Sequence, residues 1–168
     1  MMSFARKYVR IVDAINYRVG RFSMYLLYVL MGILLWSSIS NIIRQNAIWT
    51  LEMAQFTMVA YYMLGGPYSL QLDSNVRMDL LYGRWSDKKK AWVDAFSIFA
   101  LIFYLGVLLY GAVDSTVYSL EYAERSATAW RPYISPIKII MVIGIFLMLL
   151  QAFAIFFKDL AKARGEEL

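Results

Sequence analysis

The side chains that could do chemistry in this chain are almost all carboxylates, ammonium groups and guanidinium groups. Its 168 residues include no His and no Cys. Imidazole and thiolate ligands, thiol nucleophiles and the usual imidazole proton shuttle are therefore all missing. We expect no cofactor and no haem, iron–sulfur or zinc site.

The few acidic residues near apolar segments lie at the ends of those segments. Glu52, Asp94 and Asp114 occupy such positions, and no ionisable side chain lies near the middle of any segment. Proton- or ion-coupled carriers usually keep a carboxylate within the membrane, because it carries the coupling. We therefore expect these three residues to be interfacial, and we expect that the chain does not transport a solute alone.

Long apolar segments predict an all-α integral membrane protein. Hydrophobic residues make up 61% of the chain, compared with roughly 45–50% in soluble domains. Four windows contain no Asp, Glu, Lys or Arg, namely 22–43, 53–72, 95–113 and 139–157. At about 1.5 Å per residue, each window can cross a hydrocarbon core of about 30 Å as a helix. Residues 1–168 are thus expected to form one membrane domain with four transmembrane helices.

The distribution of basic residues predicts the orientation in the membrane. Of the 17 Lys and Arg, 13 lie in the N-terminal segment, the central loop and the C-terminal tail, whereas Arg44, Arg125, Arg131 and Lys138 lie between the windows on the other side. The positive-inside rule places both termini in the cytoplasm of a bacterium, with the chain in the inner membrane. The same distribution explains the net charge of +5 without a nucleic-acid partner.

Residues 4–21 have the pattern of an amphipathic helix lying on the inner leaflet. At 100° per residue, apolar side chains from Phe4 to Val19 share one face, and charged side chains, Asp13 among them, lie opposite. We expect membrane lipids to be the partner of this segment through generic attraction to anionic headgroups; a specific lipid or protein site is the alternative. The proposed anchor residues are Arg6, Lys7, Arg10, Arg18 and Arg21.

Polar and small residues within the windows indicate helix packing. Gly65, Gly66 and Pro67 interrupt the second window, where we expect a kink and close helix contact rather than a substrate site. Gln151 lies within the fourth window, and its amide is expected to bond across helices, either within this chain or to a partner.

Several short stretches together resemble one protein family. They are Trp49-Thr50-Leu51-Glu52, Leu64-Gly65-Gly66, the run from Asn75 to Tyr82 that contains Val76-Arg77-Met78-Asp79, Trp130-Arg131-Pro132, and Ser135-Pro136-Ile137. Their order resembles the small membrane subunit of tripartite ATP-independent periplasmic (TRAP) transporters, the DctQ-like family. Asn75 departs from that family, which commonly has His before Val-Arg-x-Asp.

The resemblance implies a non-enzymatic role inside a larger transporter. It implies a large TRAP membrane subunit with the substrate and sodium sites, and a periplasmic solute-binding protein that delivers an organic acid or similar solute. The small subunit would brace the large one. We expect Arg77 and Asp79 to hold a structural turn. Docking of the binding protein is assigned to the loop 119–138, through Glu121, Glu124, Arg125, Trp130, Arg131 and Tyr133.

Two other functions remain open from the sequence. A self-contained four-helix transporter is expected to hold a membrane-embedded carboxylate. A membrane enzyme would need acids gathered at one face, and the candidates are Asp73, Asp79, Asp87 and Asp94.

Overall fold

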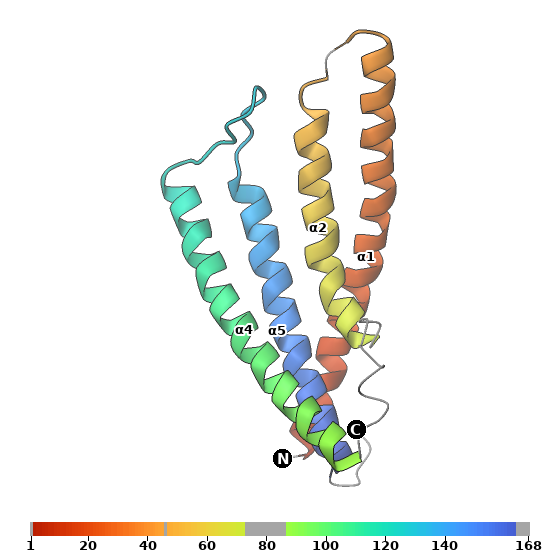
Figure 1. Ribbon diagram of the computed structural model, residues 1–168, viewed down its shortest axis with the longest axis vertical. Coiled ribbons are helices and arrows are strands. Elements are labelled where there is room, and N and C mark those ends of the chain that lie inside the picture. Colours follow the sequence, from red (N-terminus) through yellow and green to blue (C-terminus); the bar gives the residue numbers. More distant parts are fainter. Residues whose placement is uncertain (1, 46, 73–86, 164–168) are drawn as a thin grey trace.

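The described part of the chain is built from helices. The computed structural model describes residues 2–45, 47–72 and 87–163. They form α1 (Met2–Ile42), α2 (Thr50–Gln71), α4 (Asp87–Glu121) and α5 (Ser135–Ala163) (Figure 1). No strand occurs in these ranges, and the one extended pairing is an isolated bridge between Arg125 and Tyr133. The expected all-α class with four helices is confirmed for these residues.

Three of the helices are long and apolar enough to cross a membrane. The candidate spans are Ala5–Ile42, Phe96–Glu121 and Ser135–Leu160. The remaining helix, α2, has 22 residues and is long enough to cross a membrane, but its mean hydropathy is lower than that of these three spans. Gln55, Thr57, Gly65, Gly66 and Pro67 lower its hydropathy. That α2 also spans the membrane remains a prediction.

The first helix continues without a break where the sequence suggested two separate helices. Residues 4–21 and the first apolar window belong to one helix of 41 residues. Its first half packs on α5, where Val9 and Val12 form a buried cluster with Ala154. Ile11 and Ile15, expected on the same apolar face, are instead exposed. Part of that face is therefore covered by protein, and contact of the remainder with lipid stays a prediction.

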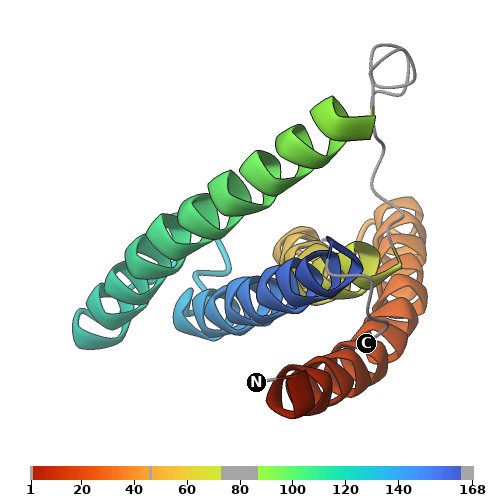
Figure 2. The ribbon, with the colours of Figure 1, turned by 90° about the horizontal axis from the view of Figure 1, so that it is seen from below.

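The other three helices are arranged around α5. Helices α1 and α2 pack against each other, and both contact α5, whereas α4 packs mainly on α5. Seen from below, α4 lies on the opposite side of α5 from α1 and diverges from the others (Figure 2). Helix α4 thus has one covered side and a wide exposed surface.

Glycines allow the closest helix contacts, as expected for the second window. A Cβ built on Gly144 of α5 would lie 2.6 Å from the backbone oxygen of Met63 in α2. A Cβ on Gly66 would overlap the end of Met148, and one on Gly20 would overlap the ring of Tyr68. These contacts join α1, α2 and α5 into one packed unit.

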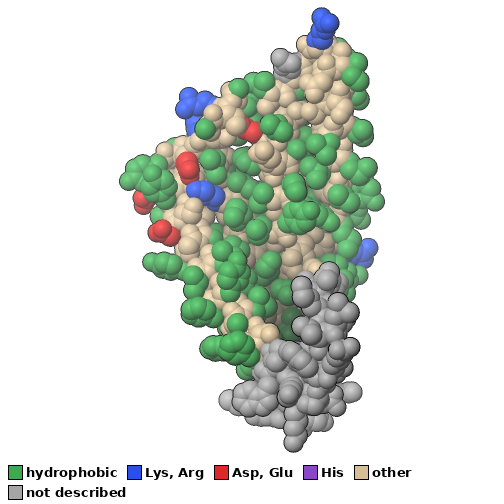
Figure 3. All heavy atoms as spheres, in the orientation of Figure 1, with side chains coloured by type: hydrophobic (Ala, Val, Ile, Leu, Met, Phe, Trp, Pro, Cys, Tyr) green, Lys and Arg blue, Asp and Glu red, His purple; other side chains and the backbone are tan. Residues whose placement is uncertain are grey.

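The surface of the molecule is strongly apolar. Large side chains such as Tyr28 on α1 and Phe96 and Tyr110 on α4 are well exposed. Figure 3 shows hydrophobic side chains over most of the described surface on this face, with charged side chains mainly toward the end that carries the connections α1–α2 and α4–α5. A contiguous apolar surface of this kind indicates a lipid or protein environment.

Candidate functional site

The segment between α4 and α5, here called the outer loop (residues 122–134), has a defined backbone conformation. Helix α4 ends where Ala123 adopts a left-handed conformation (φ 48°) and the Glu124 amide bonds to the Ser119 oxygen at 3.1 Å. This arrangement satisfies the last carbonyls of a helix. The chain then folds back on itself, because the Ser126 amide bonds to the Pro132 oxygen at 2.9 Å and the Ile134 amide to the Glu124 oxygen at 3.1 Å.

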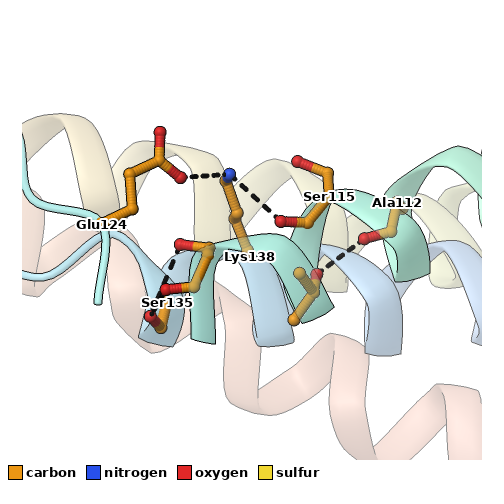
Figure 4. Close-up of polar contacts among 7 residues, drawn as sticks. Ala112, Ser115, Glu124, Ser135 and Lys138 are labelled. Atoms are coloured by element: carbon orange, nitrogen blue, oxygen red, sulfur yellow. Dashed lines mark hydrogen bonds and ion pairs between the residues drawn. The ribbon is translucent and has the colours of Figure 1, made fainter. Parts of the chain in front are cut away.

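An ion pair fastens the base of the outer loop to both neighbouring helices. Lys138 Nζ lies 2.7 Å from Glu124 Oε2 and also donates to the Ser115 oxygen at 3.3 Å (Figure 4). The hydrogen bonds from Lys138 and Ser119 lower the pKa of the Glu124 carboxyl. Beside this pair, Ser135 Oγ donates to the Ser119 oxygen at 3.2 Å. The carboxylate therefore remains ionised at neutral pH and holds the two helix ends together.

Arg125 and Tyr133 bind each other across the outer loop. The guanidinium lies over the Tyr133 ring, 4.2 Å from its centroid, and also donates to the Tyr133 hydroxyl. A cation over an aromatic face is an attractive contact. Both residues were expected to face the binding protein, and the structure shows that each is already engaged within the loop.

The tip of the outer loop carries the two side chains best placed to meet another protein. Trp130 and Arg131 are exposed, and Arg131 has a left-handed backbone (φ 49°). Neither side chain makes a hydrogen bond, ion pair or ring contact with the described residues. Glu121 is also exposed, at the end of α4. The six expected docking residues thus divide into a base of Glu124, Arg125 and Tyr133, a tip of Trp130 and Arg131, and Glu121 beside them.

Glu52, which the sequence placed at an interface with water, is instead buried. It is 3% exposed at the start of α2. Ser126 Oγ donates to Glu52 Oε1 at 3.3 Å, and Glu52 Oε2 has no hydrogen-bond partner among the described residues. The outer loop folds over Glu52, so its burial depends on a contact 74 residues away in the sequence. The nearest local signal was the run of small or polar residues on α2, Thr50, Ala54, Thr57 and Ala60, which are also buried.

A second polar cluster, here called the inner cluster (Asp13, Asn16, Gln151 and Lys158), joins α1 to α5. Gln151 Nε2 donates to Asp13 Oδ1 at 3.0 Å, and Lys158 Nζ donates to Asp13 Oδ2 at 2.8 Å. Asn16 Nδ2 donates to Gln151 Oε1 at 2.6 Å, and both amides are fully buried. Gln151 therefore bonds within this chain, which resolves the alternative left open by the sequence. The role of Asp13 was missed, because its partners lie on another helix.

The remaining expected residues lie outside these two clusters. The anchor residues Arg6, Lys7, Arg10, Arg18 and Arg21 are all exposed on α1. Arg21 also donates to the Tyr17 hydroxyl at 3.3 Å. Arg77 and Asp79 lie outside the described residues, as do Asp73 and the side chains of Asp87 and Asp94. Among the side chains that are described, no group of three or more Asp or Glu could hold a metal ion.

Three helices that are long and apolar enough to cross a membrane indicate a multi-pass membrane protein. Residues 30–162 match the family described as tripartite ATP-independent periplasmic transporters, DctQ component. The chain belongs to this family, so it is the small membrane component of a TRAP transporter. No curated protein and no solved structure gives a significant match.

Proposed function

We propose that this chain braces the large membrane subunit of a TRAP transporter in a bacterial inner membrane and helps dock the periplasmic solute-binding protein. The complex would take up an organic acid or similar solute together with a coupling ion. The observation that carries this proposal is the family match across residues 30–162. An accessory role, with no transport by the lone chain, follows from the placement of its charges.

The charges of the inner cluster support a bracing role. Asp13 and Lys158 neutralise each other at 2.8 Å, and Gln151 occupies the second oxygen of Asp13. A carboxylate held in this way stabilises the contact between two helices, whereas a coupling site must bind and release an ion during each cycle. The described part of the chain thus has the character of a fixed support.

The outer loop supports a docking role. Its base is held by Glu124 with Lys138 and by Arg125 with Tyr133, so the tip is presented in a defined position. Trp and Arg, the residues at the tip, are enriched among those that contribute most to protein interfaces. A rigid loop also loses less conformational entropy when a partner binds.

Reconstitution in liposomes tests the proposal. Three preparations would be compared under a sodium or proton gradient: this chain alone, this chain with the large subunit, and the pair with the binding protein and its solute. We expect uptake in the third preparation and none in the first. Robust uptake by the chain alone would favour a self-contained transporter. Full uptake by the large subunit and binding protein without this chain would refute the accessory role.

A further inference from the structure

Helix α4 presents two rows of residues to its surroundings, each with alternating spacings of three and four residues. We call them the polar row and the phenylalanine row. The polar row consists of Ser97, Ala100, Tyr104, Val107, Gly111, Asp114 and Tyr118. The phenylalanine row consists of Phe96, Phe99, Phe103, Gly106, Tyr110, Val113 and Val117. One residue of offset separates the rows by about 100° around the helix.

Both rows lie away from the side of α4 that packs on α5, and the ring contact of Tyr118 with Tyr122 is local. Helix α4 packs on α5 through a third side, where Leu105 is buried and Leu101, Ile102, Leu109 and Ala112 are partly buried. All seven residues of the polar row are exposed. A Cβ added to Gly111 or Gly106 would meet nothing within 4 Å, whereas Cβ atoms on Gly66 and Gly144 would collide with neighbouring helices.

The two rows differ in the environment that suits them. The phenylalanine row has large apolar side chains and one hydroxyl, which lipid tails accommodate well. The polar row has three hydroxyls, one carboxylate and two small residues, and Tyr104 lies at the middle of the apolar window 95–113. Hydroxyls there have no water to bond with. Small and hydroxyl-bearing residues are the types enriched where membrane helices pack against each other.

Asp114 indicates which kind of helix covers the polar row. It is exposed and makes no hydrogen bond or ion pair with the described residues. Two copies of this chain in one membrane share an orientation, so pairing through this row would be parallel and would place Asp114 against Asp114. Two carboxylates in contact across such an interface repel each other. A different protein with a cation or hydrogen-bond donor at the level of Asp114 fits the row better.

We propose that the polar row of α4 is the surface on which a transmembrane helix of the large subunit packs, with the phenylalanine row facing lipid. The assignment rests on the proposed function, since it takes the large subunit as the partner. The polar row of α4 is then the surface through which this chain braces the large subunit.

Photocross-linking tests the assignment with a matched pair of tyrosines. The photoreactive residue p-benzoyl-phenylalanine would replace Tyr104 in the polar row or Tyr110 in the phenylalanine row, which are 61% and 79% exposed. The complex with the large subunit would be irradiated in membranes. We expect an adduct of this chain with the large subunit from position 104 only. An adduct from position 110 alone or from both positions, an adduct of two copies of this chain, or no protein adduct would overturn the assignment.

A matched pair of glycines gives a second test. Leucine at Gly111 would fill the polar row, whereas leucine at Gly106 would fill the phenylalanine row, and a Cβ at either position meets no atom of this chain within 4 Å. We expect Gly111→Leu to weaken assembly by about tenfold in titrations with the purified large subunit, and Gly106→Leu to leave it unchanged. If Gly111→Leu and Gly106→Leu weakened binding of the large subunit equally, the assignment would be refuted. If the wild-type chain does not bind the large subunit at all, the proposed function itself fails.

Discussion

Glu124 and Glu52 hold the outer loop in two different environments. The side chain of Glu124 is 36% exposed and forms an ion pair with Lys138. Glu52 is buried and receives one hydroxyl bond from Ser126. The first contact depends on ionisation of a group near water. The second depends on how well the loop covers the start of α2.

The Glu124 contact predicts a dependence on pH. Because the pKa of Glu124 is lowered from its ordinary value of 4.5, its stabilising contribution is complete above pH 4.5 and disappears as the pH falls through the lower folded-state value. In thermal unfolding at pH 7, Glu124→Gln should be less stable than the wild type, and this difference should vanish in stronger acid. Glu121→Gln removes an exposed carboxylate on the same side and serves as the control. A difference that grows on acidification would contradict the prediction.

Sequence reasoning identified polar residues well, but it could not identify their partners. It selected Glu124, Arg125 and Tyr133 by type and position, and the structure brings them together with Lys138 at the base of the outer loop. It expected Glu52 to be interfacial and did not predict its burial, because the covering residue Ser126 is remote in sequence. Periodicity reports which face of a helix is apolar, and it contains no information on which loop folds over that face.

At the scale of helices, the inner cluster explains how the N-terminal half of α1 is held on α5. Gln151 is the central residue, since its amide bonds to both Asp13 and Asn16. Replacing it by Leu leaves the buried Asn16 amide without its partner and removes one of the two hydrogen bonds to Asp13. We expect Gln151→Leu to lower the free energy of unfolding in detergent by about 1–3 kcal/mol.

The double variant with Asn16→Leu separates loss of hydrogen bonding from loss of packing. Replacing both partners by apolar residues removes the unsatisfied Asn16 amide, so part of the stability should return. A double variant that is less stable than the sum of the single effects would contradict this explanation.

Close packing between α2 and α5 predicts a steric effect at Gly144. The added methyl of Gly144→Ala would lie 2.6 Å from the Met63 oxygen and 2.9 Å from its carbon. Backbone atoms cannot move aside without moving the helix, so we expect a loss of about 1–3 kcal/mol in unfolding free energy. Gly32→Ala, with nothing within 4 Å, should instead stabilise by up to about 1 kcal/mol through helix propensity. Equal stability of both variants would refute the proposed contact.

The helices themselves were predictable to different degrees. Uninterrupted apolar runs predicted the C-terminal half of α1 and the central parts of α4 and α5. The continuity of α1 was not predicted, because charge density changes near Arg21 while helix-forming residues continue on both sides. Helix α2 was expected because the window 53–72 has no charged residue, although its Gly, Pro and polar residues make this the least apolar of the four windows. Its contacts with α1 and α5 are tertiary features that composition does not determine.

For the whole molecule, the distribution of Lys and Arg predicts that both termini face the cytoplasm. A reporter active only in the cytoplasm should function when fused after Leu168, and a reporter active only in the periplasm should function when inserted after Ala127 in the outer loop. The physical reason is the excess of basic residues on the predicted inner side. Periplasmic activity at the C-terminal fusion would exclude this topology and would also place the outer loop on the wrong side for docking.

Docking at the outer loop predicts different effects for its two arginines. Arg131 is exposed at the tip without a partner among the described residues, whereas Arg125 is stacked on Tyr133. In the complete transporter, Arg131→Glu should raise the half-saturating concentration of binding protein by about tenfold and leave the maximal uptake rate unchanged. Arg125→Glu should also destabilise the loop, which a lower unfolding temperature would reveal.

Arg44 supplies the matched control for this last prediction. It is an exposed cation on the connection between α1 and α2, on the same side of the molecule (Figure 1). Arg44→Glu makes the same change in net charge, so it has the same long-range effect on the approach of a charged partner. If Arg131 makes a direct contact, Arg44→Glu should shift the half-saturating concentration much less than Arg131→Glu, and the difference should persist at high salt, where long-range attraction is screened. Equal shifts that disappear together in salt would assign the effect to overall charge and would exclude the tip of the outer loop as a contact site.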